Sequence, residues 1–201
     1  MDFGFNSQEY AFRQEVDDFI KRELPANWAE ESHYWPGGYG TIPEFEELNP
    51  IAERFRRRLA EKSWLALSWP KEYGGAGRSN IEQAIFNERM SYYRAPGPSV
   101  ATLISGPTIL MFGSDEAKKN WLPKIARADI RFWLAYSEPN AGSDLAAIQT
   151  RAVEDGDYLV INGQKTWSSG AHVSDFAWML VRTDTDARAH RGISLVIVDN
   201  K

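Results

Sequence analysis

Two polar segments in the second half of the chain carry residue types suited to a flat heteroaromatic ligand. The first is Ser137-Glu-Pro-Asn-Ala-Gly-Ser-Asp144, which follows an apolar stretch. Pro139 fixes φ and removes one donor, while Asn140 and Gly142 tolerate unusual backbone angles. Such a loop can present successive backbone N–H groups and a serine hydroxyl to one ligand. On these grounds alone, an ordinary polar turn explains the segment equally well.

The second segment is Asn162-Gly-Gln-Lys-Thr-Trp-Ser-Ser169. Asn-Gly is a strong signal for a two-residue hairpin turn, so we expect 164–169 to be the returning strand. Residues two apart on a strand face the same way, so Lys165, Trp167 and Ser169 would share one face. An indole beside a small hydroxyl suits a flat ring that also needs a hydrogen-bond donor, although a core tryptophan beside a solvated serine gives the same pattern.

Both segments resemble signatures of the acyl-CoA dehydrogenase family. Residues 136–144 resemble its Thr/Ser-Glu-Pro-Gly-Ala-Gly-Ser-Asp signature, and 161–169 resemble its Asn-Gly-x-Lys-x-Trp-Ile-Thr/Ser segment. Pro70-Lys-Glu-Tyr-Gly-Gly75 and Leu122-Pro123 match further landmarks, so the resemblance extends over essentially the whole chain. The departures from the family pattern are Asn140 in place of glycine, Leu134 in place of tyrosine or phenylalanine, and Ser168 in place of an apolar residue.

The resemblance implies FAD as the cofactor and assigns residues to it. Leu134, Tyr136 and Ser137 would line the pyrimidine side of the flavin. The remaining cofactor-binding residues implied are Ser143, Trp167, Ser168 and Ser169.

Within this implied site the individual roles differ. Trp167 would pack along the isoalloxazine, and Ser168 and Ser169 would flank it, with the Ser169 hydroxyl near N5. Ser143 would also bind substrate, through its CoA arm. Glu138 is expected to brace the turn rather than act as a base, and Asp144 is expected to order the loop.

The resemblance also implies a reaction, the α,β-dehydrogenation of an acyl-CoA thioester. A carboxylate takes the α-proton while the β-hydrogen leaves as hydride to flavin N5. In the family that carboxylate lies in a C-terminal helical bundle, which also supplies much of the adenosine contact. We therefore expect no catalytic residue in this chain, and a fragment that alone is inactive and binds FAD poorly.

The implied partners are an acyl-CoA substrate, an electron-transfer flavoprotein as electron acceptor, and other subunits of a homo- or hetero-oligomer, a dimer or tetramer joined through the bundle. Two alternatives stay open. One is a flavin monooxygenase or oxidase of the same fold, and the other is a non-catalytic subunit completed by a partner chain. Fatty, branched and sterol-side-chain acyl groups all remain candidate substrates.

Composition excludes several other classes of protein. The 201 residues carry a net charge of -5, which argues against a nucleic-acid surface. Cysteine is absent, so no disulfide or thiolate metal site can form, and His33, His172 and His190 lack ligand spacing, so we expect no metal. No signal peptide and no membrane-spanning run are visible, which favours the cytoplasm.

The pattern changes near residue 130, so we predict an α+β protein with a helical domain at 1–129 and a β domain at 130–201. Asn6 with Glu9, and Ser79 with Glu82, are capping boxes that predict helix starts. The predicted helices begin at Asn6, Pro43, Ile51, Ser79, Pro98 and Ser114, and the fifth is expected to be buried and kinked near Gly106-Pro107.

After residue 128 the apolar period approaches two. Strands are predicted over 130–137, 145–154, 158–161, 164–169, 176–182 and 193–198. They would form a partial antiparallel barrel or sandwich that leaves an apolar edge unpaired, with the family's C-terminal helical bundle missing. The sequence therefore indicates either a fragment or a chain completed by another polypeptide.

Overall fold

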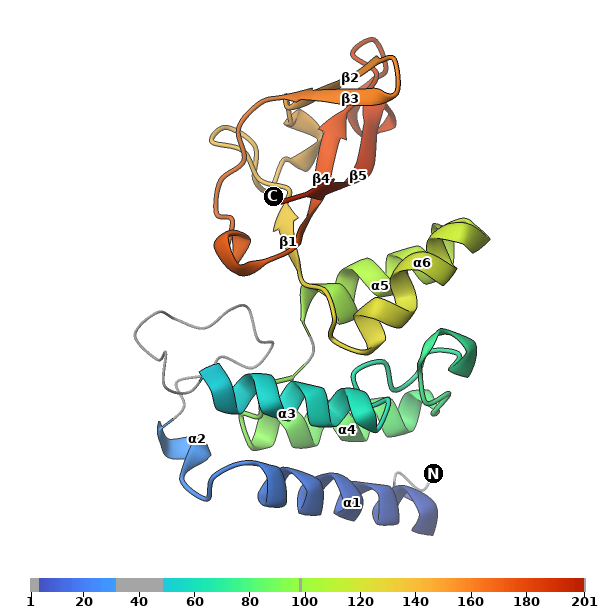
Figure 1. Ribbon diagram of the computed structural model, residues 1–201, viewed down its shortest axis with the longest axis vertical. Coiled ribbons are helices and arrows are strands. Elements are labelled where there is room, and N and C mark those ends of the chain that lie inside the picture. The colour runs from blue at the N-terminus through green and yellow to red at the C-terminus, as the bar shows by residue number, and fades with distance from the viewer. Residues whose placement is uncertain (1–3, 32–48, 98, 201) are drawn as a thin grey trace. The chain divides into compact units, whose positions relative to one another are not determined.

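The computed structural model describes residues 4–31, 49–97 and 99–200, which form two compact units divided after Asp129 (Figure 1). The first unit is helical and the second contains the sheet. The predicted order, a helical domain followed by an incomplete β domain, is confirmed. The helix expected after Pro43 falls mostly outside the described residues.

The helical unit begins its helices where the capping signals predict. Asn6 and Ser79 each accept a hydrogen bond from the backbone three residues on, and Glu9 and Glu82 return it. Phe5 and Tyr10 close the first cap with ring centroids 5.7 Å apart. The helices are α1 (Ser7–Glu23), α2 (Trp28–Glu31), α3 (Asn49–Glu61), α4 (Asn80–Tyr92), α5 (Gly106–Phe112) and α6 (Asp115–Ala126).

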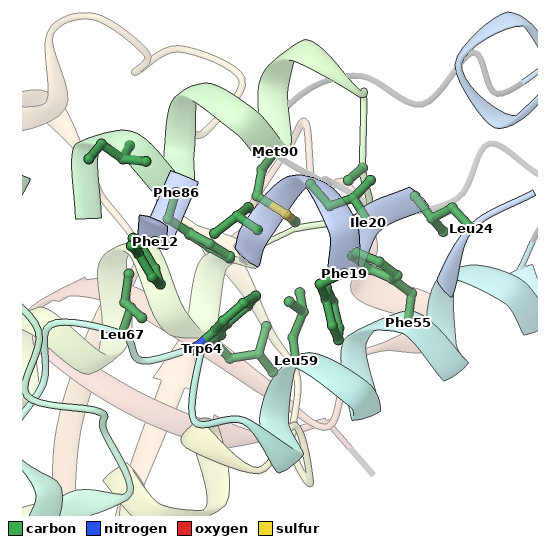
Figure 2. Close-up of a cluster of buried hydrophobic side chains, with 14 of the residues drawn as sticks. Phe12, Phe19, Ile20, Leu24, Phe55, Leu59, Trp64, Leu67, Phe86 and Met90 are labelled. Atoms are coloured by element: carbon green, nitrogen blue, oxygen red, sulfur yellow. The ribbon is translucent and has the colours of Figure 1, made fainter. Parts of the chain in front are cut away.

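Aromatic side chains make the core of this unit. Trp64, which follows α3, lies edge-on to Phe12, Phe19 and Phe86, with centroid distances of 5.6, 5.1 and 5.9 Å (Figure 2). Edge-to-face pairs of this kind add to the free energy gained by burying the rings. The rings therefore pack α1, α3 and α4 together, which accounts for part of the high aromatic content.

A buried ion pair joins α1 to α4. Arg89 donates to the Asp17 carboxylate, and only 8% and 16% of the two side chains are exposed. The Arg89 guanidinium also lies 4.5 Å from the ring centroid of Tyr92. Both charges are thus compensated inside the helical unit, as burial requires.

The stretch from 99 to 112 differs from the buried, kinked helix that we expected after Pro98. Ala101–Ser105 form a π-helical turn that runs into α5. Gly106 packs so closely on the Trp69 ring that no Cβ would fit there. Val100 and Ile109 are buried together with small residues, whereas Leu103, Met111 and Phe112 are exposed, so the stretch is only partly buried, contrary to the prediction.

The last predicted helix is also longer than expected. It continues through Pro123 to Ala126 instead of ending at Leu122. Proline removes one N–H donor but does not always end a helix. Among the helices that the structure describes, none is both long and apolar enough to cross a membrane.

The β unit is a five-stranded mixed sheet with the order β1-β4-β2-β3, and β5 pairs with β4. β1 runs parallel to β4, whereas β4–β5 and β2–β3 are antiparallel. The prediction of a wholly antiparallel sheet is therefore wrong, because a long connection lets β1 and β4 point the same way. The strands are β1 (Phe132–Ala135), β2 (Arg151–Asp155), β3 (Tyr158–Asn162), β4 (Phe176–Arg182) and β5 (Ile193–Asp199).

The strand predicted over 164–169 is absent from this sheet. The β2–β3 hairpin turns at Gly156 (φ 61°), and β3 runs through Asn162 without a turn at Asn162-Gly163. The strand predicted over 145–154 starts later, since Leu145–Ala147 form a 3₁₀ turn before β2. The described strands do not close into a barrel.

The Ser79 cap gives a direct test of the helical unit. Ser79→Ala should lower the free energy of unfolding by about 1 kcal/mol, because one N-terminal amide of α4 loses its acceptor. Ser91→Ala, at an exposed site on the same helix, should leave stability unchanged or slightly raised. Urea denaturation compares them, and equal losses would show that the cap does not hold α4.

Candidate functional site

The first polar segment folds into a tight turn directly after β1. Glu138 and Ala141 exchange backbone hydrogen bonds of 2.8 and 3.1 Å, which closes the turn around Pro139 and Asn140. Pro139 and Asn140 are exposed, whereas Glu138 and Ala141 are buried. The turn therefore presents a polar tip to solvent while a carboxylate points inward.

The Glu138 carboxylate is the centre of the hydrogen bonding here. It accepts from the backbone N–H groups of Gln149 at 2.7 Å and Thr150 at 2.9 Å. Lys165 Nζ donates to it at 2.9 Å, and the two side chains are 9% and 5% exposed. One buried ion pair therefore joins the 137–144 loop, the start of β2 and the 164–169 segment.

These contacts set the charge state of Glu138. Burial alone would raise the pKa of this carboxyl, but the two amide N–H groups and the Lys165 ammonium outweigh it and hold the pKa at about 2. The Thr150 hydroxyl adds to the lowering, although it lies outside hydrogen-bond geometry. Glu138 is therefore ionised at neutral pH, and a base with so low a pKa is weak.

Lys165 brings the two polar segments into contact. Its ammonium also donates to the Tyr136 carbonyl oxygen at 3.1 Å, and the neighbouring Thr166 N–H donates to the Ser137 carbonyl oxygen at 2.9 Å. The structure thus places Tyr136 and Ser137 directly beside the segment that carries Trp167. Tyr136, Ser137 and Trp167 are among the residues that were predicted from the sequence to bind a ligand.

Trp167 does not share a face with Lys165, contrary to the expectation from strand alternation. Its φ of 56° lies in the left-handed region, and the indole is 85% exposed, whereas Lys165 is buried. The Ser169 N–H donates to the Trp167 carbonyl oxygen at 3.0 Å, so the chain curls tightly here. A left-handed residue breaks the two-residue alternation, which makes the predicted shared face wrong.

Gly163 is needed for this path of the chain. A Cβ on Gly163 would collide with the backbone and side chain of Thr150, the residue whose N–H binds Glu138. The pairing of Lys165 with Glu138 was not predicted from the sequence, and Gly163 was expected in a hairpin turn. Lysine side chains are usually exposed, and the residues around Lys165 do not indicate that it is buried. Its pairing with Glu138 could therefore not be predicted from sequence spacing alone.

The other proposed site residues lie in varied surroundings. Leu134 is half-buried on β1 and aligns with Trp178 of β4. Tyr136 is half-buried, and burial raises the pKa of its phenol. Ser143 and Ser169 are exposed, and Ser168 is half-buried. Among the described residues, no group of histidines and carboxylates could hold a metal ion.

Comparison with known protein families matches both halves of the chain. Residues 6–129 match the family model described as acyl-CoA dehydrogenase, N-terminal domain. Residues 134–201 match the model described as acyl-CoA dehydrogenase, middle domain.

Curated relatives are similar over nearly the full chain. Acyl-CoA dehydrogenase FadE26 of Mycobacterium tuberculosis is 39% identical over 98% of this chain and 48% of its own length. Acyl-CoA dehydrogenase FadE29 of the same organism is 44% identical over 80% of this chain and 42% of its own length. The chain thus spans about half the length of these relatives.

Solved structures show the same fold. The ChsE4-ChsE5 complex from Mycobacterium tuberculosis superposes with a TM-score of 0.84 at 36% identity, covering 100% of this chain and 49% of that chain. The Tcur3481-Tcur3483 steroid ACAD gives a TM-score of 0.83 at 37% identity, covering 99% of this chain and 49% of that chain.

The Glu138 ion pair predicts a specific pH dependence of stability. Because the folded-state pKa of about 2 lies below the ordinary value of 4.5, the ionised carboxylate stabilises the fold above about pH 4.5, and that contribution is lost as pH falls toward 2. Glu138→Gln should therefore cost about 3–5 kcal/mol at pH 7 and progressively less below pH 4.5.

Urea unfolding across this pH range measures the difference between wild type and variant. Glu154→Gln, at an exposed position of β2, is the control and should change stability little at any pH. A Glu138→Gln deficit that stayed constant from pH 7 to pH 3 would contradict the assigned charge state.

The close approach of Gly163 to Thr150 predicts a second effect. Gly163→Ala should destabilise the protein by about 1–3 kcal/mol, because the added methyl overpacks the start of β2. Gly142→Ala is the matched control, since nothing lies within 4 Å of its Cβ position, and it should change stability by less than about 0.5 kcal/mol. Thermal unfolding distinguishes them, and equal melting temperatures would refute the close packing.

Proposed function

This chain belongs to the acyl-CoA dehydrogenase family, and we therefore propose that it supplies the flavin-binding wall of an FAD-dependent enzyme that dehydrogenates acyl-CoA thioesters between the α and β carbons. The observation that supports this most is the ion pair of Glu138 and Lys165, which holds two polar segments together beside an exposed indole. The curated relatives that the chain matches are named acyl-CoA dehydrogenases.

The residues present fit a flat cofactor. Trp167 offers an indole that is 85% exposed on a segment fixed by the neighbouring Lys165 and Thr166. Exposed aromatic rings are costly to leave in water, and a planar ring system stacked on the indole would cover it. In this proposal Leu134, Tyr136 and Ser137 line the pyrimidine side, and Ser168 and Ser169 flank the ring.

Ser143 is proposed to contact both the cofactor and the CoA arm of the substrate. It is exposed near the far end of the turn that Glu138 anchors, where its hydroxyl can reach a ligand. Asn140, at the tip, keeps φ outside the left-handed region, so glycine is not needed there. The departure from the family pattern at this position therefore leaves the turn intact.

The bound FAD would accept the hydride that leaves the β carbon. The residues of this chain orient the reactants and exclude water around them. A base must also remove the α-proton, and the ionised, fully hydrogen-bonded Glu138 is unsuited to that step. We propose that the base lies outside these 201 residues, so that the chain contains no catalytic residue.

Further parts of the proposal concern organisation and partners. We propose a domain boundary near residue 129, supported by the two compact units and by the two separate family matches. We also propose assembly into a homo- or hetero-oligomer, supported by the similarity to a structure titled as the ChsE4-ChsE5 complex. An electron-transfer flavoprotein is the proposed electron acceptor.

A steroid acyl thioester is the first substrate class to test. The support is the 37% identity and the TM-score of 0.83 to the protein titled Tcur3481-Tcur3483 steroid ACAD. A panel should compare CoA thioesters of steroid side chains with those of straight and branched fatty acids. The highest kcat/KM identifies the preferred class.

The experiment that tests the function uses the complete natural protein. It should carry an absorption band at about 450 nm, typical of flavin, and anaerobic acyl-CoA should bleach that band and yield the enoyl-CoA. An electron-transfer flavoprotein should then restore the colour faster than air does. A colourless protein would contradict the proposal, and a hydroxylated product formed with dioxygen would favour a monooxygenase.

Trp167 provides a residue-level test of the cofactor wall. Trp167→Ala in the complete protein should raise the dissociation constant of FAD by about tenfold, because one stacking surface is lost. Tyr158→Ala is the control, since Tyr158 is 78% exposed on β3 of the same unit. Titration of flavin fluorescence measures the FAD affinity of both variants. Equal affinities would show that the isoalloxazine does not stack on Trp167.

A further inference from the structure

We propose that Lys165 is a positioning residue. Its buried ammonium fixes the Tyr136–Ser137 backbone relative to the Trp167 ring, and these groups form part of the proposed flavin-binding surface. This inference rests on the proposed function. It adds a role for a side chain that itself touches no ligand.

The first support is the set of atoms that one cation joins. Lys165 Nζ lies 3.1 Å from the Tyr136 carbonyl oxygen and 2.9 Å from Glu138 Oε1. The first acceptor belongs to the chain leaving β1, and the second belongs to the turn after it. The ammonium therefore fixes both against the segment that carries Trp167, two residues further on.

The second support is that the ion pair is tied to the sheet itself. Glu138 accepts from the Thr150 N–H at 2.9 Å, and the Thr150 carbonyl accepts from the Arg182 N–H at 2.7 Å. Arg182 ends β4, so the carboxylate is connected through Thr150 to the strand at the centre of the sheet. The turn that holds Lys165 is thus itself tied to the sheet, through Glu138 and Thr150.

The third support is that no strand pairing holds the Trp167 segment. Within the part of the chain that the structure describes, residues 164–169 pair with no strand, and Thr166 makes one backbone hydrogen bond to Ser137. A segment without a hydrogen-bonded ladder needs side-chain anchors to keep one geometry. Lys165 is such an anchor, because its side chain is 5% exposed and its ammonium donates to two acceptors.

The test compares four variants of the complete, flavin-containing protein. Lys165→Met and Glu138→Gln each break the ion pair, and Lys165→Arg keeps a cation there. Arg89→Met breaks a buried ion pair in the helical unit, with Asp17, and is the matched control. The measurements are the FAD dissociation constant and the visible circular dichroism of the bound flavin, both taken well below the melting temperature.

Lys165→Met and Glu138→Gln should raise the FAD dissociation constant at least about tenfold and alter the dichroism of the flavin. Lys165→Arg should keep the dissociation constant within about threefold of wild type. Arg89→Met should lower the melting temperature while leaving affinity and dichroism unchanged.

Three results would overturn the inference. One is a Lys165→Met protein with a lower melting temperature but wild-type affinity and dichroism, since the ion pair would then only stabilise the fold. Another is an Arg89→Met protein that loses flavin as readily. If Lys165→Met does not fold, Glu138→Asp is tested in its place. An unaltered visible dichroism of the flavin in Glu138→Asp is then the third result that would overturn the inference.

The outcome for the wild-type protein separates this inference from the proposed function. A wild type that binds no flavin overturns both. A wild type that binds flavin and bleaches with acyl-CoA, together with ion-pair variants that bind equally well, overturns only the role of Lys165.

Discussion

A carboxylate removed from water must have its charge compensated and its oxygens hydrogen-bonded, and the β unit is arranged around one such group. Glu138 obtains two amide donors from the start of β2 and an ammonium from Lys165. The two amides and the ammonium come from two different stretches of chain, so the requirement for compensation brings both stretches to the turn that carries Glu138. The contact between the 137–144 loop and the 164–169 segment beside β1 follows from that electrostatic requirement.

The helical unit meets a different requirement, because its stability comes from aromatic packing. Trp64 contacts rings from α1 and α4 (Figure 2), and the Arg89–Asp17 ion pair joins the same two helices. These aromatic rings and charged groups have their partners within the helical unit. The exposed Met111 and Phe112 at the end of α5 are exceptions in this unit.

Local signals in the sequence predicted much of this fold, and the two polar segments that they marked do lie in contact, through Lys165 and Thr166. Their role in binding FAD stays a prediction. The capping boxes of α1 and α4 and the apolar run of β4 are confirmed, because each depends on neighbours in sequence. The errors involve distant contacts. Asn162-Gly163 resembles a hairpin turn, but Gly163 is required by its approach to Thr150, and the parallel pairing of β1 with β4 leaves no local trace. The partner of Glu138 likewise lies 27 residues away.

Trp167 occupies a backbone conformation that suits glycine or asparagine better, with a φ of 56°. A left-handed residue with a large side chain carries strain of about 1–2 kcal/mol. A thermostabilisation programme that scans for such conformations would select Trp167 for replacement, together with Ser63, Arg94, Ala128 and Ala189. If Trp167 binds the flavin as proposed, a substitution that relieves this backbone strain would weaken cofactor binding, so stability and flavin binding place opposite demands on this residue.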